Sequence, residues 1–496
     1  MILSKLLKNI DNYNVFGKIN KNIQNISQNS KKIAKNVLFF CINGTKTKGC
    51  IYINEAIKNG AVAIVTDKKI NFDNEKENLL IKNKLKNITQ IVVNNVRRAM
   101  AIMSANFYNN PQKKLKIVGI TGTNGKTSCS YLICSILKFL GKKVGLIGTN
   151  GVFINDKKFD AHMTTPDSIE LFKFFDKMVK AKVEFCVMEV SAHAIYFDKV
   201  YGINFAVKAL TNVKTDHLDF FKTQQNYQSV KQSFFKKDDL CVLNKNDKIG
   251  QKISKKCKKS LNFGKKNSNF LILSTKCQLG KTNFKVKFED KIYNITSSLT
   301  GKFNIDNISL AICVVKCLGF KIEDIINKIV AIKNIDGRFD VVFENKNINI
   351  IIDYAHTLDS LKNLLSTIKN VSKNKNIIVF GCPGERDTKK RFLMGKLAAQ
   401  FCDCVIFTSD NPASENPRRI MFEMQEGLKS SKKNIDYYLI EDRKKAIKKA
   451  ITTAIKQKNV NVLIVGKGIE NYQIVGEKFI TYSDYDTVKC VLKKLF

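Results

Sequence analysis

The feature that most constrains this chain is a short turn with two glycines and a lysine between two apolar segments. The turn, GITGTNGKTS, spans residues 119–128. Before it, KLKIVGI (114–120) is expected to form a buried strand, and after it KTSCSYLICSILKFLG (126–141) has the apolar periodicity of a helix that ends on a glycine. A strand, a glycine turn and a helix in this order are typical of a phosphate-binding loop in an α/β domain.

The side chains of this turn suit a nucleotide. Gly122 and Gly125 allow backbone N–H groups to approach phosphate oxygens, and the helix adds its positive N-terminus. Lys126 can reach the β- and γ-phosphates, and the hydroxyl of Thr127 can bind Mg²⁺. The most common loop, G-x-x-x-x-G-K-[ST], needs glycine at position 120, which is isoleucine here. The turn therefore predicts an ATP-dependent enzyme whose loop differs from the most common type.

Composition narrows the class of protein further. The 496 residues suffice for roughly three domains. The 85 Lys and Arg against 43 Asp and Glu are spread along the chain, without the basic stripes and interleaved aromatic residues of a nucleic-acid interface, so we expect no nucleic-acid partner. No apolar run approaches the ~18 residues of a membrane span, and we expect neither a signal peptide nor membrane insertion. The 14 scattered cysteines predict free thiols in a cytoplasmic protein.

The strand and helix patterns divide the chain into three segments. Residues 1–110 alternate short apolar runs with helical patterns, as in a small α/β domain, and residues 111–335 predict a largely parallel sheet around the glycine turn. Within residues 336–496, four apolar strands each end in a polar or glycine turn: 347–356, 376–387, 402–412 and 461–472. Because ligands of open α/β sheets bind beyond the carboxyl ends of the strands, these four turns predict one binding site.

The loop TGTNGKT resembles the ATP loop of the Mur ligase family. Further matching stretches lie between about residue 28 and residue 482: TTPD (164–167), MEVSAHA (188–194), TNVKTDHLD (211–219), KFNIDN (302–307), DGRFD (336–340), DYAHTLD (353–359), FGCPGERD (380–387), SDNPASENP (409–417) and GKGIENYQ (466–473). In this order they resemble the members that add the third amino acid of the peptidoglycan stem, the UDP-N-acetylmuramoyl-tripeptide synthetases.

This resemblance implies the three-domain α/β architecture of the family. A small N-terminal α/β domain (1–110) would bind the UDP-sugar, and a central P-loop ATPase-like domain with a parallel sheet (111–335) would bind ATP. A C-terminal Rossmann-like domain (336–496) would bind the amino acid. The implied protein is a monomer whose partners are small-molecule substrates.

The resemblance also implies the reaction. ATP would phosphorylate the γ-carboxylate of D-Glu in UDP-MurNAc-L-Ala-D-Glu, and the amine of a diamino acid would attack the acyl phosphate to give the amide, ADP and phosphate. A carboxylate is a poor electrophile, and phosphorylation makes its oxygen a leaving group. The site must therefore supply cations for the phosphates, with ATP and Mg²⁺ as the implied cofactors.

Four residues have implied catalytic roles: Lys126, Glu189, His217 and Lys231. Glu189 follows a strand and would bind Mg²⁺ together with Thr127, and His217 would bind a second Mg²⁺. Lys231 matches the lysine that reacts with CO₂ to form N6-carboxylysine. A carbamate turns a cation into an anionic oxygen ligand, which suits a hard metal such as Mg²⁺.

The remaining implied contacts fall into three groups by ligand. ATP would be bound by Gly122, Thr123, Asn124, Gly125, Lys126, Thr127, Ser128, Asn304, Asn307, Arg338, Asp353 and His356. UDP-MurNAc-dipeptide would be bound by Ser30, Thr164, Thr165, Ser191 and Lys199. The incoming amino acid would be bound by Arg386, Asp410, Asn411, Ala413, Gly466 and Glu470.

The fourth residue of the DNP-x motif bears on which amino acid is added. In family members that add meso-diaminopimelate this residue is an arginine that pairs with the distal carboxylate, and here it is Ala413. Because burying an unpaired carboxylate is costly, the sequence favours L-lysine or ornithine over meso-diaminopimelate. Arg418 and Arg419 lie close by in the sequence and could supply a substitute cation, which keeps diaminopimelate open.

Several motif positions depart from the family pattern: Lys31, Ala192, Lys199, Leu358 and Ile469. Lysine in place of arginine keeps the charge but loses the bidentate fork. Two alternatives follow, namely another Mur-type ligase and a non-catalytic nucleotide-binding paralogue. The combination of TTPD, DYAHT and a DNP turn argues against the first, and the presence of all four expected catalytic residues argues against the second.

Overall fold

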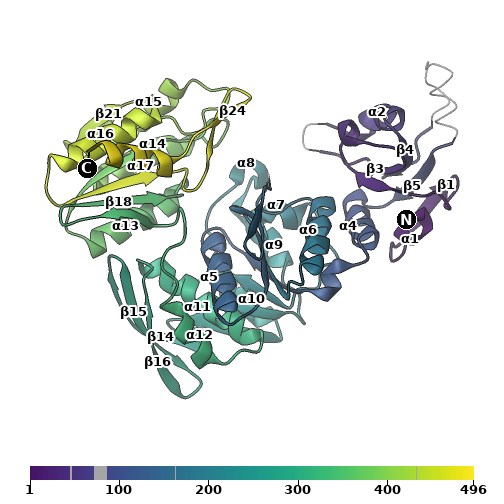
Figure 1. Cartoon of the computed structure of the whole chain (residues 1–496), viewed down its shortest axis with the longest axis horizontal. Coiled ribbons are helices and arrows are strands. Elements are labelled where there is room, and N and C mark those ends of the chain that lie inside the picture. Colours follow the sequence, from purple (N-terminus) through teal and green to yellow (C-terminus); the bar gives the residue numbers. More distant parts are fainter. Residues whose placement is uncertain (45–46, 72–86, 162, 432, 496) are drawn as a thin grey trace. The chain divides into compact units, whose positions relative to one another are not determined.

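The structure, a computed structural model, describes five stretches of the chain: residues 1–44, 47–71, 87–161, 163–431 and 433–495. The chain forms two compact units, whose elements are labelled in Figure 1. Unit one comprises residues 1–121 and 141–208, and unit two comprises residues 122–140 and 209–496. Among the described residues, no helix has the length and apolarity that crossing a membrane requires.

Unit one begins with a five-stranded sheet in the order β1-β5-β4-β3-β2, in which β1 alone is antiparallel to its neighbour. Its strands are β1 (Tyr13–Phe16), β2 (Asn25–Ser27), β3 (Val37–Phe40), β4 (Ala61–Thr66) and β5 (Thr89–Val93). The accompanying helices are α1 (Leu3–Leu6), α2 (Ile53–Lys58) and α4 (Val96–Phe107). Strand β3 has all four residues buried, which agrees with its continuous apolar sequence VLFF.

The rest of unit one contains the strand that leads to the phosphate loop. Strands β6 and β7 both pair in parallel with β10, and β8 and β9 extend the sheet as antiparallel hairpins. The bounds are β6 (Lys116–Thr121), β7 (Val144–Gly148), β8 (Gly151–Ile154), β9 (Lys157–Phe159), β10 (Phe185–Glu189), α6 (Ser168–Lys180) and α7 (Ala192–Tyr196). Strand β11 (Val207–Leu210) lies where the chain passes from unit one to unit two.

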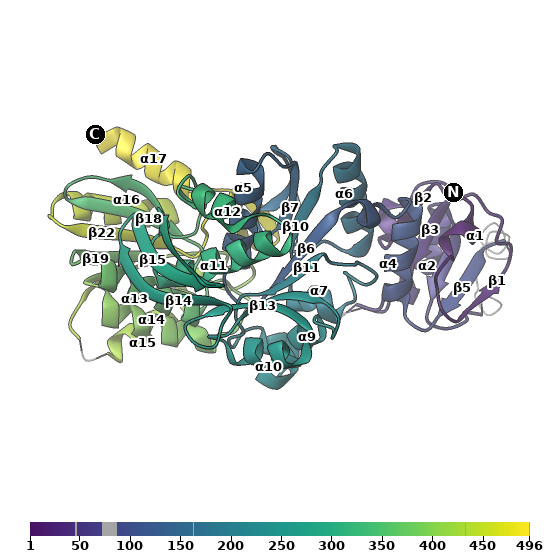
Figure 2. The same cartoon turned by 90° about the horizontal axis from the view of Figure 1, so that it is seen from below.

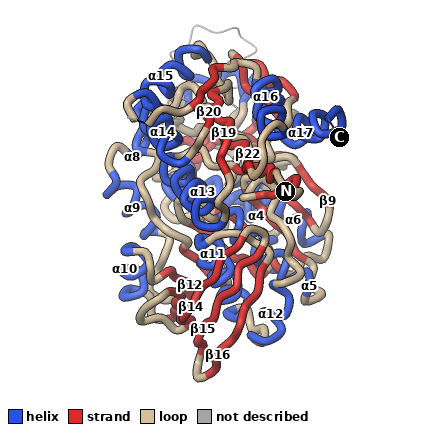
Figure 3. Tube along the Cα trace, turned by 90° about the vertical axis from the view of Figure 1, so that its left-hand side faces the viewer, coloured by secondary structure: helices blue, strands red, loops and turns tan. Residues whose placement is uncertain are grey.

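The first half of unit two combines the helix after the phosphate loop with a run of strands in the order β12-β13-β14-β15-β16. Its elements are α5 (Lys126–Phe139), α8 (Leu218–Phe221), α9 (Gln224–Ser233), β12 (Leu240–Asn244), α10 (Lys248–Lys256), β13 (Lys259–Gly264), β14 (Phe270–Gln278), β15 (Lys281–Phe288), β16 (Lys291–Ser297), α11 (Lys302–Cys317) and α12 (Ile322–Ile329). Strands β14, β15 and β16 lie side by side as antiparallel hairpins (Figure 3), an addition to the parallel strands that the sequence predicts.

The second half of unit two is a six-stranded sheet in the order β17-β18-β22-β19-β20-β21, parallel except for β17. The bounds are β17 (Asp340–Glu344), β18 (Ile348–Asp353), α13 (Leu358–Val371), β19 (Lys375–Phe380), α14 (Lys389–Phe401), β20 (Cys404–Phe407), α15 (Pro417–Lys429), β21 (Asp436–Leu439), α16 (Arg443–Ile455), β22 (Val460–Val465), β23 (Tyr472–Val475), β24 (Lys478–Thr481) and α17 (Asp484–Leu495). Figure 2 shows α13, α14 and α15 on one side of this sheet and α16 on the other. The predicted strands β18, β19, β20 and β22 are all present.

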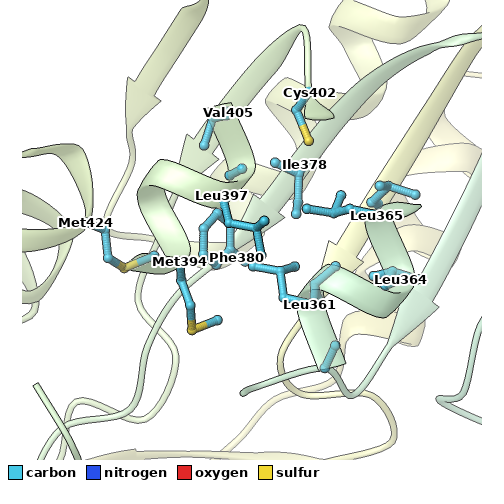
Figure 4. Close-up of a cluster of buried hydrophobic side chains, with 14 of the residues drawn as sticks. Leu361, Leu364, Leu365, Ile378, Phe380, Met394, Leu397, Cys402, Val405 and Met424 are labelled. Atoms are coloured by element: carbon cyan, nitrogen blue, oxygen red, sulfur yellow. The ribbon is translucent and has the colours of Figure 1, made fainter. Parts of the chain in front are cut away.

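A buried apolar cluster joins α13, α14 and α15 to one face of the six-stranded sheet (Figure 4). Leu361, Leu364 and Leu365 of α13 pack with Ile378 and Phe380 of β19, and all five are at most 2% exposed. A second cluster packs α16 and α17 on the opposite face. The two clusters fix the sheet from which the polar turns project.

Truncation of this cluster is expected to destabilise the protein. Leu365→Ala should lower the free energy of unfolding by about 2–5 kcal/mol, because a fully buried leucine leaves a cavity in a packed core. Leu393→Ala on the neighbouring helix α14 is the matched control, since Leu393 is 44% exposed, and its effect should stay within about 0.5 kcal/mol. Urea unfolding of the full chain measures both, and equal losses would contradict the assignment of Leu365 to the core.

Candidate active site

The phosphate loop of unit two has room only for glycine at two positions. Gly122 and Gly125 have φ values of 148° and 86°. A Cβ atom on Gly122 would lie 1.9 Å from Thr211 Oγ1, and one on Gly125 would lie 2.6 Å from Asn307 Oδ1. The two glycines thus let the loop pass close to its neighbours while its backbone turns into helix α5.

The loop is held by hydrogen bonds to the segment after β11. The Thr123 N–H donates to the Asn212 carbonyl at 2.8 Å, and the Asn124 N–H donates to Asn212 Oδ1 at 3.1 Å. The Thr211 hydroxyl in turn donates to the Asn124 carbonyl at 2.6 Å. The Asn124 side chain reaches Asp359 Oδ2 in the first turn of α13 at 3.1 Å. These contacts fix the backbone that the sequence predicts to face phosphate.

Three of the predicted ATP-binding side chains meet at the start of α5. Lys126 Nζ donates to the carbonyls of Gly122 and Thr123, each at 2.9 Å. Arg338 Nη2 donates to Thr127 Oγ1 at 3.2 Å. The structure therefore gathers two cations and a hydroxyl at the positive N-terminus of a 14-residue helix, an environment that favours a polyphosphate.

The predicted asparagines Asn304 and Asn307 stand beside the loop on α11. Asn307 Nδ2 donates to Asn304 Oδ1 at 3.0 Å, and Asn304 Nδ2 donates to the Thr300 carbonyl at 2.8 Å. A cavity of about 190 Å³ opens next to Asn304 and Arg338, with Thr300 and Phe339 also in its lining. The asparagine amides thus hydrogen-bond to one another and to the backbone, and Asn304 also lines this cavity.

Lys231 lies in a buried aromatic environment on α9. Its side chain is 1% exposed, and its ammonium lies 5.1 Å from the ring centroid of Tyr227. The Tyr227 hydroxyl is 3.1 Å from Thr123 Oγ1 in the phosphate loop, and the His217 ring lies 6.2 Å from the Tyr227 ring. Burial, helped by the charge of Lys126, lowers the pKa of Lys231 well below its usual value, which favours a neutral amine.

The imidazole of His217 is suited to bind a metal ion. His217 has a φ of 53° and precedes helix α8. Its Nε2 is 3.5 Å from Asp216 Oδ2, an orientation that can hold the ring. Desolvation lowers the pKa of His217, so the imidazole is neutral at pH 7, the form that binds metals.

Asp353 is the last residue of β18 and His356 lies in the turn that follows, so both are at the predicted strand end. Asp353 accepts N–H hydrogen bonds from Phe339 and Ala355, at 2.6 and 2.8 Å, and burial raises the pKa of its carboxyl. His356 Nδ1 is 2.9 Å from the Tyr354 carbonyl. Desolvation lowers the pKa of His356 to about 4, so its ring is neutral at pH 7.

The shift at His356 predicts a pH-dependent contribution to stability. Because its folded pKa lies below its unfolded pKa of 6.5, the unfolded chain binds the proton more readily, and this contribution is lost as the pH falls from 6.5 toward 4. We expect the difference in unfolding free energy between the native chain and His356→Gln to fall by roughly 1–2 kcal/mol from pH 7 to pH 5. Urea unfolding at the two pH values measures it, and a constant difference would show that His356 titrates normally.

Glu189 in unit one is a buried strand-end carboxylate. It is 1% exposed, accepts from the Thr149 N–H at 3.0 Å and from the Thr149 hydroxyl at 3.2 Å, and would touch any Cβ added to Gly148. Its carbonyl accepts from the Thr165 hydroxyl at 2.8 Å. Thr149 follows β7 and did not figure among the predicted residues, although its position after an apolar strand resembles that of Glu189.

The residues predicted to bind the UDP-sugar peptide are also in unit one. Thr165 Oγ1 accepts from the Ser191 N–H at 3.1 Å, and Thr164 Oγ1 lies 3.1 Å from Thr149 Oγ1. Lys199 is buried and lies 2.8 Å from Asp167 Oδ1. Ser30, at the start of a short 3₁₀ turn, donates to Glu55 at 2.5 Å. Thr164, Thr165 and Ser191 therefore cluster near Glu189, whereas Lys199 and Ser30 are engaged with carboxylates of the protein.

The polar turn after β22 hydrogen-bonds to the turns after β18 and β20, and the turn after β20 hydrogen-bonds to the turn after β19. The single ligand site predicted for the four turns stays a prediction. Asn411 Nδ2 donates to Glu470 Oε2 at 3.1 Å, and Lys467 Nζ donates to both Asn411 Oδ1 and Glu470 Oε2, at 3.0 and 2.8 Å. Asp410 is buried, which raises the pKa of its carboxyl, and it lies against Gly466, where a Cβ would be 2.6 Å from Asp410 Oδ2. Lys467, fully buried, was not predicted although it lies in the GKGIE motif.

Arg418 and Arg419, the two candidate substitute cations for position 413, both form ion pairs with glutamates. Ala413 has a φ of 50°, donates its N–H to the Ile474 carbonyl at 3.2 Å and accepts from the Gly476 N–H at 2.8 Å. Arg418 pairs with Glu441 at 3.0 Å and Arg419 with Glu423 at 3.4 Å, and both side chains are more than three quarters exposed. Arg386 is exposed.

The donor atoms fit the implied cofactors. Two glycines with no space for Cβ, a lysine and a helix N-terminus fit the phosphates of ATP. The Thr127 hydroxyl, the Glu189 carboxylate and a carbamate on Lys231 are hard oxygen donors that fit Mg²⁺. Within the described residues no cluster of three or more His, Cys, Asp or Glu forms a cation site, and Glu189 belongs to unit one whereas Thr127 and Lys231 belong to unit two, so the joint metal site stays a prediction.

The chain has a glycine phosphate loop ahead of helix α5, and it has polar turns at the carboxyl ends of the strands in the six-stranded sheet. These features are those of an ATP-dependent α/β enzyme. Residues 22–108 match the family described as "Mur ligase family, catalytic domain", residues 120–315 match "Mur ligase middle domain" and residues 337–468 match "Mur ligase, glutamate ligase domain". The chain therefore belongs to the Mur ligase family.

Relatives and solved structures agree with this assignment. The chain is 38% identical over its whole length to a UDP-N-acetylmuramoyl-L-alanyl-D-glutamate–2,6-diaminopimelate ligase of Clostridium acetobutylicum, all of which it covers. It is 40% identical to such a ligase of Clostridium perfringens over 99% of the chain and all of the relative. A solved ligase of this name superposes with a TM-score of 0.68 at 25% identity, over 100% of this chain and 99% of that one. A Thermotoga maritima MurF ligase in complex with ADP shares the fold, with a TM-score of 0.60 at 18% identity over 95% of this chain and 97% of that one.

Proposed function

We propose that this chain is the ligase that joins a diamino acid to the D-Glu γ-carboxylate of UDP-MurNAc-L-Ala-D-Glu in peptidoglycan synthesis, using ATP and an acyl phosphate. The observation that carries the proposal is the gathering of Lys126, Thr127 and Arg338 around a glycine loop at a helix N-terminus, in a chain that matches tripeptide-forming relatives end to end. The known relatives support the substrate class, and the loop supports the use of ATP.

In this reaction the chain's own residues would act mainly by stabilising the negative charge of the phosphates. Lys126 and the N–H groups of residues 122–125 would bind the β- and γ-phosphates, and Arg338 would stabilise the charge that moves with the γ-phosphoryl group. The binding residues would also bring the carboxylate to the phosphorus and exclude water, which would otherwise hydrolyse the acyl phosphate. The amine of the incoming amino acid then forms the C–N bond as phosphate leaves and a proton is released.

We propose that Thr127, Glu189, His217 and a carboxylated Lys231 hold Mg²⁺. The ion, when bound, would supply Lewis-acid stabilisation of phosphate charge. The neutral amine favoured at Lys231 is the form that can add CO₂, with loss of one proton. The neutral imidazole of His217 can serve as a ligand.

For the amino acid, the relatives support 2,6-diaminopimelate, because the two Clostridium ligases described above bear that name. A second candidate, L-lysine or ornithine, rests on one local observation. Ala413 offers no cation for a distal carboxylate, and Arg418 and Arg419 pair with glutamates at the surface. We propose diaminopimelate as the substrate and lysine as the alternative that must be tested beside it.

The test is ATP-dependent phosphate release with UDP-MurNAc-L-Ala-D-Glu and meso-diaminopimelate, L-lysine or L-ornithine in separate reactions. Release with diaminopimelate alone would support the first candidate, and release with lysine or ornithine alone would support the second. The absence of release with all three, from folded protein, would contradict the ligase function.

Position 413 can be tested by substitution. Ala413→Arg is expected to raise the ratio of kcat/KM for meso-diaminopimelate to that for L-lysine by roughly tenfold or more, because the new guanidinium can pair with the distal carboxylate. Gln457→Arg, at an exposed residue just after α16 and outside the polar turns, is the control and should change the ratio little. An unchanged ratio for Ala413→Arg would exclude position 413 from the pocket.

The location and assembly are also proposals. Among the described residues the 14 cysteines are thiols rather than disulfides, which supports a reducing cytoplasm, where ATP is available. We propose a monomer, which size-exclusion chromatography with light scattering can test.

A further inference from the structure

A single buried arginine connects two of the polar turns. Arg391 lies in the first turn of α14 and its side chain is fully buried. Its two terminal nitrogens make a bidentate pair with Glu415, at 2.9 Å each, and Nη1 also lies 2.9 Å from Glu423 Oε2. Nη2 reaches the Pro383 carbonyl at 3.5 Å. The guanidinium thus contacts the turn after β19 directly and the turn after β20 through Glu415.

Glu415 extends this connection back to the turn after β19. One of its oxygens accepts from the Glu385 N–H as well as from Arg391. Hydrogen bonding to Arg391 is the main reason why the pKa of Glu415 lies below its usual value, so this carboxylate is ionised at neutral pH. A charge-assisted bidentate pair of this kind is both strong and directional.

The two turns also touch through their backbones. The Gly384 N–H donates to the Asn411 carbonyl at 2.9 Å, and a Cβ on Gly384 would lie 1.9 Å from the Pro412 carbonyl oxygen. The Ser414 hydroxyl donates to Glu385 Oε1 at 2.6 Å. Glu385 and Ala413 both adopt positive φ, at 55° and 50°, a conformation that non-glycine residues keep only where their surroundings impose it.

The second carboxylate on Arg391 provides a natural comparison. Glu423 lies on α15 and contacts Arg391 and Arg419, at 2.9 and 3.4 Å. None of its described hydrogen bonds or ion pairs reaches either turn, whereas Glu415 binds the Glu385 N–H. The two glutamates are about equally exposed, at 28% and 30% of the side chain.

We propose that Arg391 and Glu415 are a positioning pair that holds the turn carrying Arg386 against the turn carrying Asp410, Asn411 and Ala413. The inference rests on the proposed function, because it takes these turns as the amino-acid pocket. The pair acts through the two turns and need not touch the substrate. Since a misplacement of about 1 Å can cost on the order of 100-fold in rate, a clamp on two ligand-binding turns has a direct effect on amino-acid use.

The test compares Glu415→Gln with Glu423→Gln in the full chain. Each variant removes one negative charge next to Arg391 and replaces one carboxylate oxygen by an NH₂ donor. Only at Glu415 does this break a bidentate pair with Arg391 whose other oxygen also accepts from the Glu385 N–H. We expect Glu415→Gln to raise KM for the amino acid by roughly tenfold, with KM for ATP changed by less than about threefold. Glu423→Gln should change both constants by less than about threefold, even if the two variants lose similar thermal stability. Glu415→Asp keeps the negative charge and should therefore raise KM for the amino acid less than Glu415→Gln does.

Three outcomes would overturn the proposal. Equal rises in the KM for the amino acid in both glutamine variants would mean that Arg391 only supports packing. A rise in KM for ATP instead would place the two turns outside the amino-acid pocket. Native protein that releases no phosphate with any diamino acid would refute the proposed function itself, and the positioning role with it, whereas failure of the variants alone leaves the ligase function intact.

Discussion

Lys126→Ala is expected to reduce ATP-dependent ligation on the order of 1000-fold, because it removes the cation at the centre of the phosphate loop. Lys126 Nζ lies against the Gly122 and Thr123 carbonyls, at the N-terminus of α5, where the phosphates are expected. Both kcat and the affinity for ATP should fall, because the Lys126 ammonium is expected to interact with the bound nucleotide and with the phosphoryl group during transfer.

Lys138→Ala is the matched control for this prediction. Lys138 lies on the same helix near its C-terminus and is exposed, so its removal should leave the rate within about twofold. Steady-state phosphate release at varied ATP measures both variants. Activity of Lys126→Ala close to that of the native protein would show that the glycine loop does not bind the reacting phosphates.

Lys231→Ala is expected to reduce ligation by roughly 100-fold or more, because it removes the proposed carbamate and with it an anionic metal ligand. The side chain is buried against Tyr227, and its lowered pKa leaves amine available for CO₂. The native activity should therefore fall when CO₂ and bicarbonate are stripped from the buffer and return when bicarbonate is added.

Two controls separate carbamate formation from packing. Lys237→Ala removes an exposed lysine just beyond the same helix and should have little effect. A ¹³C NMR signal from protein equilibrated with ¹³C-bicarbonate should appear in the native chain and in Lys237→Ala, and be absent in Lys231→Ala. If the activity of the native protein does not depend on CO₂ and no ¹³C signal appears, the carbamate is excluded.

The sequence predicts those features of the fold and site that depend on local patterns. The strand KLKIVGI, the glycine turn and the helix from Lys126 are adjacent in the chain, and apolar runs that end in polar turns identify β18, β19, β20 and β22 directly. Strands β15 and β16 escape this reasoning because Lys, Asn and Thr interrupt their apolar residues, and β14 because its apolar run FLIL is short and its remaining residues are mostly exposed.

Contacts between distant segments are the part that the sequence does not reveal. Tyr227 meets Thr123 across 104 positions, and Glu189 meets Thr149 across 40. Nothing in the local sequence marks Arg391 as the buried partner of Glu415, because an arginine on a helix is usually solvated. The reactive groups follow from motifs, whereas the residues that hold them in place depend on tertiary packing.

The most direct test of the central claim follows the oxygen that the proposed acyl phosphate transfers. UDP-MurNAc-L-Ala-D-Glu with ¹⁸O in the D-Glu γ-carboxylate is incubated with the enzyme, ATP and the diamino acid, and the released phosphate is analysed by mass spectrometry. The proposed function predicts one ¹⁸O atom in each phosphate, formed together with the amide product. Phosphate without ¹⁸O, released at the same rate, would show that ATP does not activate the carboxylate and would contradict the proposed ligase.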